Sequence, residues 1–211
     1  MRKLFIIILL SFFIPLALSA DEFKHGHHYD VIAASSSEKP EVVEFFSFYC
    51  PHCANFEPIA QRIEQQLPKN VSFTKMHVDF IRAASPALQN NLARAVLVAD
   101  LEGKKHQVVD AIFEQIHKKR QNFTSPEQIR QLAISAGVTP ESYDANIESF
   151  GVINAADYMK QQQTMYTEQR VLKGVPMLIV NGKYRINLEN LDGDLEAELA
   201  KLIQFLISKD D

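Results

Sequence analysis

The sequence predicts an α/β fold in which an all-helical domain interrupts the segments that build the sheet. Two strand-like runs separated by a helix precede residue 80, and a second pair of strand-like runs follows residue 174. The segment between them carries apolar residues at helical spacing and no strand-like run. Because the strands flank the helices rather than alternate with them, we expect a discontinuous sheet domain over 21–80 and 171–211 and a helical insertion over 81–170.

The first twenty residues form a separate pattern. Met1-Arg2-Lys3 is positively charged, the run Leu4–Leu18 is almost entirely apolar, and Ser19-Ala20 offers small residues before Asp21. This order is typical of a secretory signal peptide, with cleavage expected after Ala20. The apolar run is short for a membrane span, and no second run of that length follows. We therefore expect an exported chain in an oxidising compartment.

Charge and histidine content limit the possible partners. The formal net charge is −4, and removal of Arg2 and Lys3 with the signal peptide makes it −6. An acidic chain argues against nucleic acid as a partner. His25, His27 and His28 lie close together, but no second cluster at ligand spacing accompanies them, so we expect a solvated terminus and no metal site.

A buried strand over Val42–Phe48 leads into a helix that starts near Cys50. The near-continuous apolar run is typical of a strand covered on both faces. Pro51 suits the first helical turn, and Pro68-Lys69-Asn70 ends the helix. A second strand over Val71–Val78 completes a parallel crossover unit. The buried face of the helix is predicted from residues at helical spacing: Phe56, Ile59, Ile63 and Leu67.

Five helices are predicted in the insertion. Most of their starts carry a capping residue followed by proline, and most of their ends carry glycine. The expected helices run from Ser85-Pro86 to Gly103, around Val108–Ile116, from Ser125-Pro126 to Gly137, from Thr139-Pro140 to near Gly151, and over roughly 154–170.

Strand signals return at Val175–Val180. Asn181-Gly182 is a strong two-residue hairpin turn, so Lys183–Ile186 is the expected return strand. Asp194 then caps a last amphipathic helix. Proline is unusual where Pro176 stands, in an otherwise central strand. It is either an ordinary trans proline at the start of the strand or part of a cis peptide packed against the cysteines.

Cys50 and Cys53 are the two cysteines of the chain. Their disulfide would close so small a ring that it adds little stability, which suggests a chemical purpose. Cys50 is expected at a helix N-terminus, where the helix dipole stabilises a thiolate by at most ~2 kcal/mol. N–H groups of the turn and a cationic His52 are the further sources of stabilisation. Cys53, one turn further along, is expected to be more buried and to act as the resolving thiol.

Glu44 is the only acid within the apolar strand, six positions before Cys50. A buried acid needs a raised pKa or a cation as partner. Lys75 on the neighbouring strand is the candidate partner, and Glu57 on the helix is a further member of the charge cluster. In this interpretation Glu44 moves a proton to and from Cys53. The alternative is a solvated carboxylate at the edge of the sheet.

The segment Val43–Cys53, with Phe56-Glu57 after it, resembles the active-site segment of the DsbA family of thiol:disulfide oxidoreductases. Thr74–Val78, Gly174-Val175-Pro176 and Val180–Tyr184 match the same family, and the resemblance covers essentially the whole mature chain. It implies a thioredoxin-like fold with an inserted helical domain.

The resemblance also implies roles for individual residues. Cys50 becomes the exposed nucleophile and Cys53 its partner. Pro176 becomes a cis-proline, and Val175 offers its backbone to an extended substrate strand. The residues expected to tune the two thiols are Pro51, His52, Glu44, Glu57 and Lys75.

The implied activity is donation of the Cys50–Cys53 disulfide to newly exported proteins in the periplasm, through a mixed disulfide at Cys50. The redox-active disulfide is the only redox group expected, with no other cofactor and no metal. The expected partners are unfolded cysteine-containing proteins and a DsbB-like, quinone-linked membrane oxidase that restores the disulfide. The family is commonly monomeric, and we expect a monomer here.

Two other functions remain open at this stage. The first is a disulfide reductase or isomerase, and Pro51-His52 is the only part of the sequence that distinguishes it from the oxidase. A zinc-binding module needs four ligands, and Cys50, His52 and Cys53 cannot all face one ion from a single helical turn. The chain departs from the family at Ala54 and Asn55, which replace bulkier residues, and over residues 187–193. We expect these departures to act on the substrate groove or on partner docking.

Overall fold

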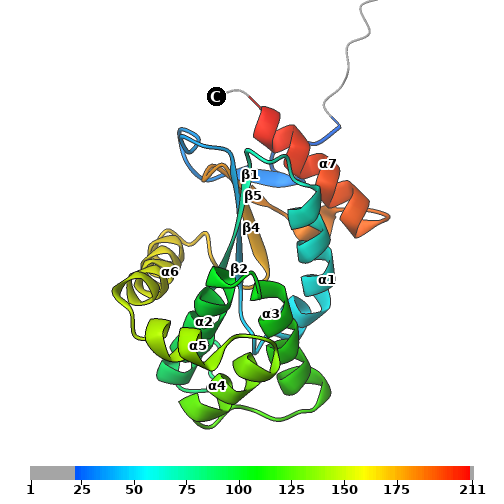
Figure 1. The fold of residues 1–211 in the computed structure, drawn as a ribbon. Coiled ribbons are helices and arrows are strands. Elements are labelled where there is room, and N and C mark those ends of the chain that lie inside the picture. Colours follow the sequence, from blue (N-terminus) through cyan, green and yellow to red (C-terminus); the bar gives the residue numbers. More distant parts are fainter. Residues whose placement is uncertain (1–21, 210–211) are drawn as a thin grey trace, which may run out of the picture.

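The computed structural model describes residues 22–209, so the predicted signal peptide and its cleavage after Ala20 lie outside the described residues. Within that range, five strands form one sheet in the order β1-β5-β4-β2-β3 (Figure 1). Only β2 and β3 pair in parallel, and every other neighbouring pair is antiparallel. The strands are β1 Tyr29–Val31, β2 Glu41–Phe46, β3 Ser72–His77, β4 Met177–Val180 and β5 Tyr184–Ile186.

The helices lie on both faces of the sheet and at one of its ends. Figure 1 shows α2 to α5 gathered at the end of the sheet where β2 leads into α1. A π-helical turn, Glu114–Lys118, extends α3, and a 3-10 turn spans Leu188–Asn190. The α-helices are α1 Pro51–Gln66, α2 Pro86–Leu101, α3 Lys105–Phe113, α4 Pro126–Ser135, α5 Pro140–Asn146, α6 Phe150–Glu168 and α7 Leu195–Ser208. The predicted α/β fold with a helical insertion is confirmed.

Side chains alternate along β2 and divide the core into layers. Val42 packs with residues of α1 and α7 on one face. Val43 and Phe45 pack on the other face, where Tyr166 of α6 meets Phe45 edge-to-face at 5.4 Å between ring centroids. Figure 1 shows the same arrangement, with α6 on one side of the sheet and α1 and α7 on the other. Glu44 therefore points toward α1, on the same face as Val42.

Most of the predicted helix starts are confirmed by their caps. The side chains of Ser85, Ser125, Thr139 and Asp194 each accept a hydrogen bond from a backbone N–H in the first turn. One predicted helix end is wrong: Gly151 does not end the fourth helix but lies inside α6. The side chain of Ser149 caps α6 by accepting from the Val152 N–H. Gly151 is the second residue of α6, so it lies in the first turn that this cap stabilises.

The N-terminal segment differs from its expectation as a solvated terminus. Phe23 and Tyr29 are buried, and β1 pairs with β5 at the sheet edge. A three-residue strand with one buried side chain is too short to give a periodic signal. His25 and His27 are exposed, while Nδ1 of His28 accepts from the Lys24 N–H at 2.9 Å. No cluster of metal-ligating side chains occurs in residues 22–209.

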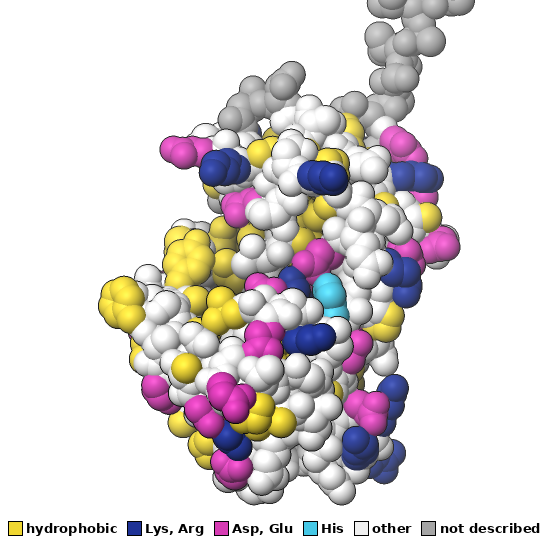
Figure 2. Space-filling view, in the orientation of Figure 1, with side chains coloured by type: hydrophobic (Ala, Val, Ile, Leu, Met, Phe, Trp, Pro, Cys, Tyr) yellow, Lys and Arg dark blue, Asp and Glu magenta, His cyan; other side chains and the backbone are white. Residues whose placement is uncertain are grey.

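The predicted hairpin at Asn181-Gly182 joins β4 to β5. Both residues have positive φ, 51° and 62°, and the Lys183 N–H donates to the Val180 carbonyl at 3.0 Å. The prediction of a two-residue loop is wrong, because Val180 pairs with Tyr184. Residues 181–183 therefore form a three-residue connection, and β5 begins at Tyr184 rather than at Lys183. Charged side chains of both signs are interspersed on the face drawn in Figure 2, while apolar side chains gather over α6. Phe150 and Tyr158 of α6 are among the exposed large apolar side chains. Among the described residues, no helix has the length and apolar character that crossing a membrane requires.

Candidate active site

The two cysteines lie where β2 ends and α1 begins. The strand ends at Phe46 rather than at Phe48, because residues 47–50 form a turn. In this turn, the Cys50 N–H donates to the Ser47 carbonyl at 3.1 Å, and the Tyr49 N–H donates to Ser47 Oγ at 3.2 Å. Cys50 is the N-cap of α1, and its Sγ accepts from the Cys53 N–H at 3.4 Å. The sulfur therefore lies at the positive end of the helix dipole.

The two thiols differ in their surroundings. Both are reduced in this structure, with Cys50 5% exposed and Cys53 fully buried. The prediction of an exposed Cys50 is wrong, because the sulfur packs against the Val175 segment and the residue is buried. Cys50 is only slightly more exposed than Cys53. Pro51 and His52 between them are exposed. Burial raises the pKa of the Cys53 thiol, so this group holds its proton.

The segment Gly174–Pro176 lies directly beside Cys50. The Val175–Pro176 peptide bond is cis, which confirms one of the two alternatives for Pro176 and excludes the trans one. The Cys50 thiol donates to the Val175 carbonyl oxygen at 3.4 Å. Gly174 is exposed, and Val175 and Pro176 are half-buried. The segment is therefore partly exposed to solvent next to the sulfur.

Glu44, Lys75 and Glu57 form a buried charge cluster behind the cysteines. Glu44 and Lys75 are register partners on β2 and β3, and Lys75 Nζ contacts Glu44 Oε2. The same ammonium lies 2.7 Å from Glu57 Oε2 on α1. Glu44 is fully buried on a strand between two neighbours, so the alternative of a solvated carboxylate at the sheet edge is wrong.

Burial and charge act on this cluster in opposite directions. Burial raises the pKa of Glu44, the Lys75 charge opposes the rise, and the Glu57 charge adds to it. Burial alone would lower the pKa of Lys75, but the two carboxylates outweigh it, so its pKa is raised. Among residues 22–209, Oε1 of Glu44 has no hydrogen-bond partner. The charge of Glu44 contributes to the raised pKa of Cys53. The arrangement is suited to accepting or releasing a proton near that thiol.

Replacing Lys75 with methionine is expected to lower the free energy of unfolding by ~3–5 kcal/mol at neutral pH, because two buried carboxylates lose the cation that contacts both of them. Urea denaturation followed by circular dichroism measures the change. The loss is expected to shrink at acidic pH, where Glu44 takes up a proton.

Lys160→Met is the matched control for this prediction. Lys160 makes an equally close contact, 2.6 Å, to Asp79, but its side chain is 53% exposed. A surface pair contributes less than about 1 kcal/mol. Equal losses in the two variants would contradict the assignment of a stabilising buried cluster.

Three further polar residues at the site were missed from the sequence. Ser47 is fully buried in the turn before Cys50. His77, at the end of β3, is buried against Phe48, and burial lowers its pKa to about 3. His117 approaches from the inserted domain and contacts the Phe48 carbonyl. Ser47 and His77 are polar residues inside apolar runs, and this pattern is the one sequence signal that could have marked them as site residues. His117 lacks it.

The departures from the family pattern lie beside two hollows near the site. Ala54 and Asn55 line a groove of about 560 Å³ between α1 and the inserted domain. Within 187–193, Asn187, Leu188 and Glu189 line a smaller pocket of about 140 Å³ that Pro176 also lines. Their effect on docking remains a prediction.

Comparison with known sequences identifies similar proteins along nearly the whole chain. The sequence profile described as "DSBA-like thioredoxin domain" matches residues 41–201. A thiol:disulfide interchange protein DsbA from Pectobacterium carotovorum is 33% identical, covering 99% of this chain and 100% of the relative. The protein of the same name from Haemophilus influenzae is 37% identical, covering 83% of this chain and 82% of the relative.

Solved structures show the same likeness. A Proteus mirabilis DsbA variant with a non-covalently bound peptide, PWATCDS, superposes with a TM-score of 0.74 at 31% identity, covering 89% of this chain and 100% of that one. A Klebsiella pneumoniae DsbA has the same TM-score at 29% identity, with 90% and 100% coverage.

Proposed function

Since this chain belongs to the family of DSBA-like thioredoxin domains, we propose that Cys50 and Cys53 form the disulfide that it donates to exported proteins. The protein is a thiol:disulfide oxidoreductase with a thioredoxin-like fold and a helical insertion. The observation that carries the assignment is the position of Cys50, at the N-terminus of α1 and 3.4 Å from the Val175 carbonyl. We further propose that the sheet domain is discontinuous, over 21–80 and 171–211, around the insertion at 81–170.

Disulfide donation takes two exchange steps. A substrate thiolate attacks Cys50 Sγ, the bond to Cys53 breaks, and a mixed disulfide forms at Cys50. The second substrate thiolate then attacks the substrate sulfur of that mixed disulfide, and Cys50 leaves as a thiolate. Two electrons pass from the substrate to the cysteine pair, and the substrate thiols give up two protons. Attack at Cys50 is supported by its position nearer the surface than Cys53.

Each sulfur has its own support in this mechanism. Cys53 leaves as a thiolate in a buried site that disfavours its charge, so it needs a proton at that moment. Glu44 is the proposed proton donor, because its pKa is raised and its Oε1 has no hydrogen-bond partner in the described part of the chain. Lys75 and Glu57 hold it in place. The Cys50 thiolate is stabilised by the helix N-terminus and its N–H groups, with Pro51 and His52 shaping the turn.

Substrate binding is proposed to use the backbone of Val175, beside Pro176. An extended segment that carries a cysteine would lie along this backbone and bring its sulfur to Cys50. The Proteus mirabilis relative binds a cysteine-containing peptide, which supports this class of ligand.

Location and partners are part of the same proposal. The N-terminal pattern supports export to the periplasm, with cleavage after Ala20. A DsbB-like, quinone-linked membrane oxidase is the proposed source of oxidising equivalents, and the protein is proposed to act as a monomer. The cysteine pair is proposed to need no cofactor.

The direction of transfer can be tested with oxidised protein and a reduced, unfolded two-cysteine substrate. We expect the substrate to gain a disulfide while an equal amount of protein thiol appears. Equilibration with glutathione should give a reduction potential well above the roughly −270 mV of thioredoxin. A potential at or below that value, with no substrate oxidation, would instead assign the protein as a reductase.

A further inference from the structure

His117 reaches the active-site segment from the inserted domain. It lies in the π-helical turn Glu114–Lys118, in which the Lys119 N–H donates to the Glu114 carbonyl at 2.9 Å. The wider turn takes these five residues out of the register of an α-helix, and such turns are frequent at functional sites. Nε2 of His117 lies 2.7 Å from the carbonyl oxygen of Phe48, two residues before Cys50.

Two histidines hydrogen-bond to the backbone of Phe48, one at its N–H and one at its carbonyl. The Phe48 N–H donates to Nε2 of His77 on β3 at 3.3 Å. Because a carbonyl oxygen only accepts, Nε2 of His117 carries the proton in the second contact. The sheet domain therefore supplies the acceptor and the inserted domain supplies the donor.

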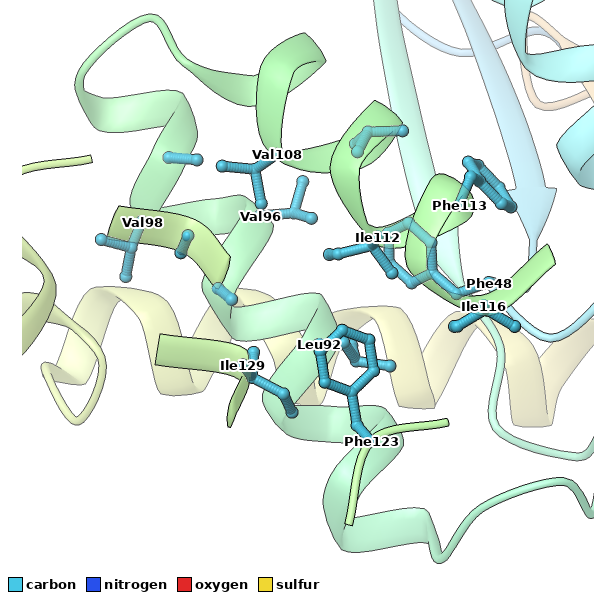
Figure 3. Close-up of a cluster of buried hydrophobic side chains, with 14 of the residues drawn as sticks. Phe48, Leu92, Val96, Val98, Val108, Ile112, Phe113, Ile116, Phe123 and Ile129 are labelled. Carbon is cyan, nitrogen blue, oxygen red and sulfur yellow. The ribbon is translucent and has the colours of Figure 1, made fainter. Parts of the chain in front are cut away.

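The ring of Phe48 ties this segment to the inserted domain as well. It is fully buried, and its centroid lies 5.0 Å from that of Phe113. Figure 3 shows Phe48 next to Phe113 and Ile116, among side chains of the helical core. With the ring and both backbone groups fixed, the chain has little freedom to move just before the turn that carries Cys50.

We propose that His117 is a positioning residue for disulfide transfer, acting on Cys50 through the Phe48 carbonyl. Its hydrogen bond fixes the Phe48–Tyr49 peptide, and this peptide leads into the turn in which Cys50 is tied to Ser47. The inserted domain thereby sets where Cys50 Sγ lies relative to the Val175 backbone. This inference rests on the proposed function and adds a residue to it that touches neither sulfur.

The test compares His117→Ala and His117→Gln by the second-order rate at which each oxidised protein forms a disulfide in a reduced two-cysteine peptide. His117→Ala is expected to lose about tenfold, because small displacements of a reacting group are costly. His117→Gln, whose side-chain amide also donates, is expected to recover most of the rate. Amide hydrogen exchange at Tyr49 should become faster in His117→Ala and stay slow in His117→Gln.

His106→Ala is the matched control. His106 lies on α3 and its Nε2 is 3.6 Å from Glu64 Oε2 on α1, so it also joins the two domains, but away from the Cys50 turn. We expect it to transfer disulfides at the wild-type rate. A wild-type rate in His117→Ala would overturn the proposal, and so would an equal loss in His106→Ala, which would indicate domain docking alone.

The glutamine variant and the wild type distinguish failure of this inference from misfolding of His117→Ala and from failure of the proposed function. If His117→Ala does not fold, a His117→Gln protein as slow as a His117→Leu protein would overturn the inference. Failure of the proposed function appears differently, as absence of transfer by the wild type itself.

Discussion

Replacing Cys50 with alanine is expected to abolish disulfide donation, leaving only the background rate of substrate oxidation that is measured without the protein. The chain has two cysteines, so Cys53 alone cannot store the two oxidising equivalents of an intramolecular disulfide. Cys53 is also fully buried with a raised pKa, so it is a poor nucleophile toward an external disulfide. The measurement is the rate of disulfide formation in a reduced substrate.

Cys53→Ala separates the roles of the two sulfurs. It also lacks the disulfide and is expected to be equally inactive as a donor. Its remaining Cys50 should nevertheless react with a small disulfide and accumulate as a mixed disulfide that mass spectrometry detects, since no resolving thiol is present. Cys50→Ala should accumulate none. A mixed disulfide on Cys53 in place of Cys50 would reverse the assignment of nucleophile and resolving thiol.

Acid is expected to destabilise the fold through His77. Burial lowers the pKa of His77 from its ordinary value of 6.5 to about 3. Between these values the unfolded chain binds a proton that the native state does not, so stability rises with pH. The neutral, buried His77 therefore lowers the free energy of unfolding progressively as the pH falls from 6.5 toward 3, by ~5 kcal/mol in total, and has no such effect above pH 6.5. The native His77 must stay neutral because its Nε2 accepts from the Phe48 N–H.

His77→Gln tests this pH dependence. The amide oxygen of glutamine can accept the same hydrogen bond but takes up no proton, so the variant should lose much less stability across this range. Glu44, whose raised pKa acts in the opposite sense, is present in both proteins and cancels in the difference. His25→Gln, at an exposed histidine, serves as control and should follow the wild type. Parallel acid unfolding of wild type and His77→Gln would refute the prediction.

Local signals were sufficient for much of the fold. Ser125 and Asp194 mark helix starts because a single side chain satisfies a backbone N–H there. Asn181-Gly182 marks the hairpin because its backbone conformation suits few other residues. These features depend on neighbours in sequence, so they can be read without knowing the tertiary structure.

Features that depend on tertiary packing could not be derived in the same way. The environment of Glu44 was undecided until the strand order placed β2 between β3 and β4. His117 carries no local signal, because its role comes from a π-helical turn and from a carbonyl far away in sequence. The cis geometry at Pro176 was expected only through family resemblance. The sequence therefore located the sulfurs and the charge cluster, but not the contacts from the inserted domain.

The pairing of β2 with β4 has a consequence for how the protein matures. Val42 pairs with Val180, so one side of β2 stays open until Val180 has been made. Domains emerge from synthesis N-terminal end first, and contacts between distant segments form slowly. The Cys50 turn and the Val175 carbonyl that it contacts therefore cannot come together before residue 175 has been made. Until then, a nascent chain carries both thiols beside an unpaired strand edge, which can pair with other chains and aggregate. At this stage the chain itself needs protection and cannot yet transfer disulfides to other proteins.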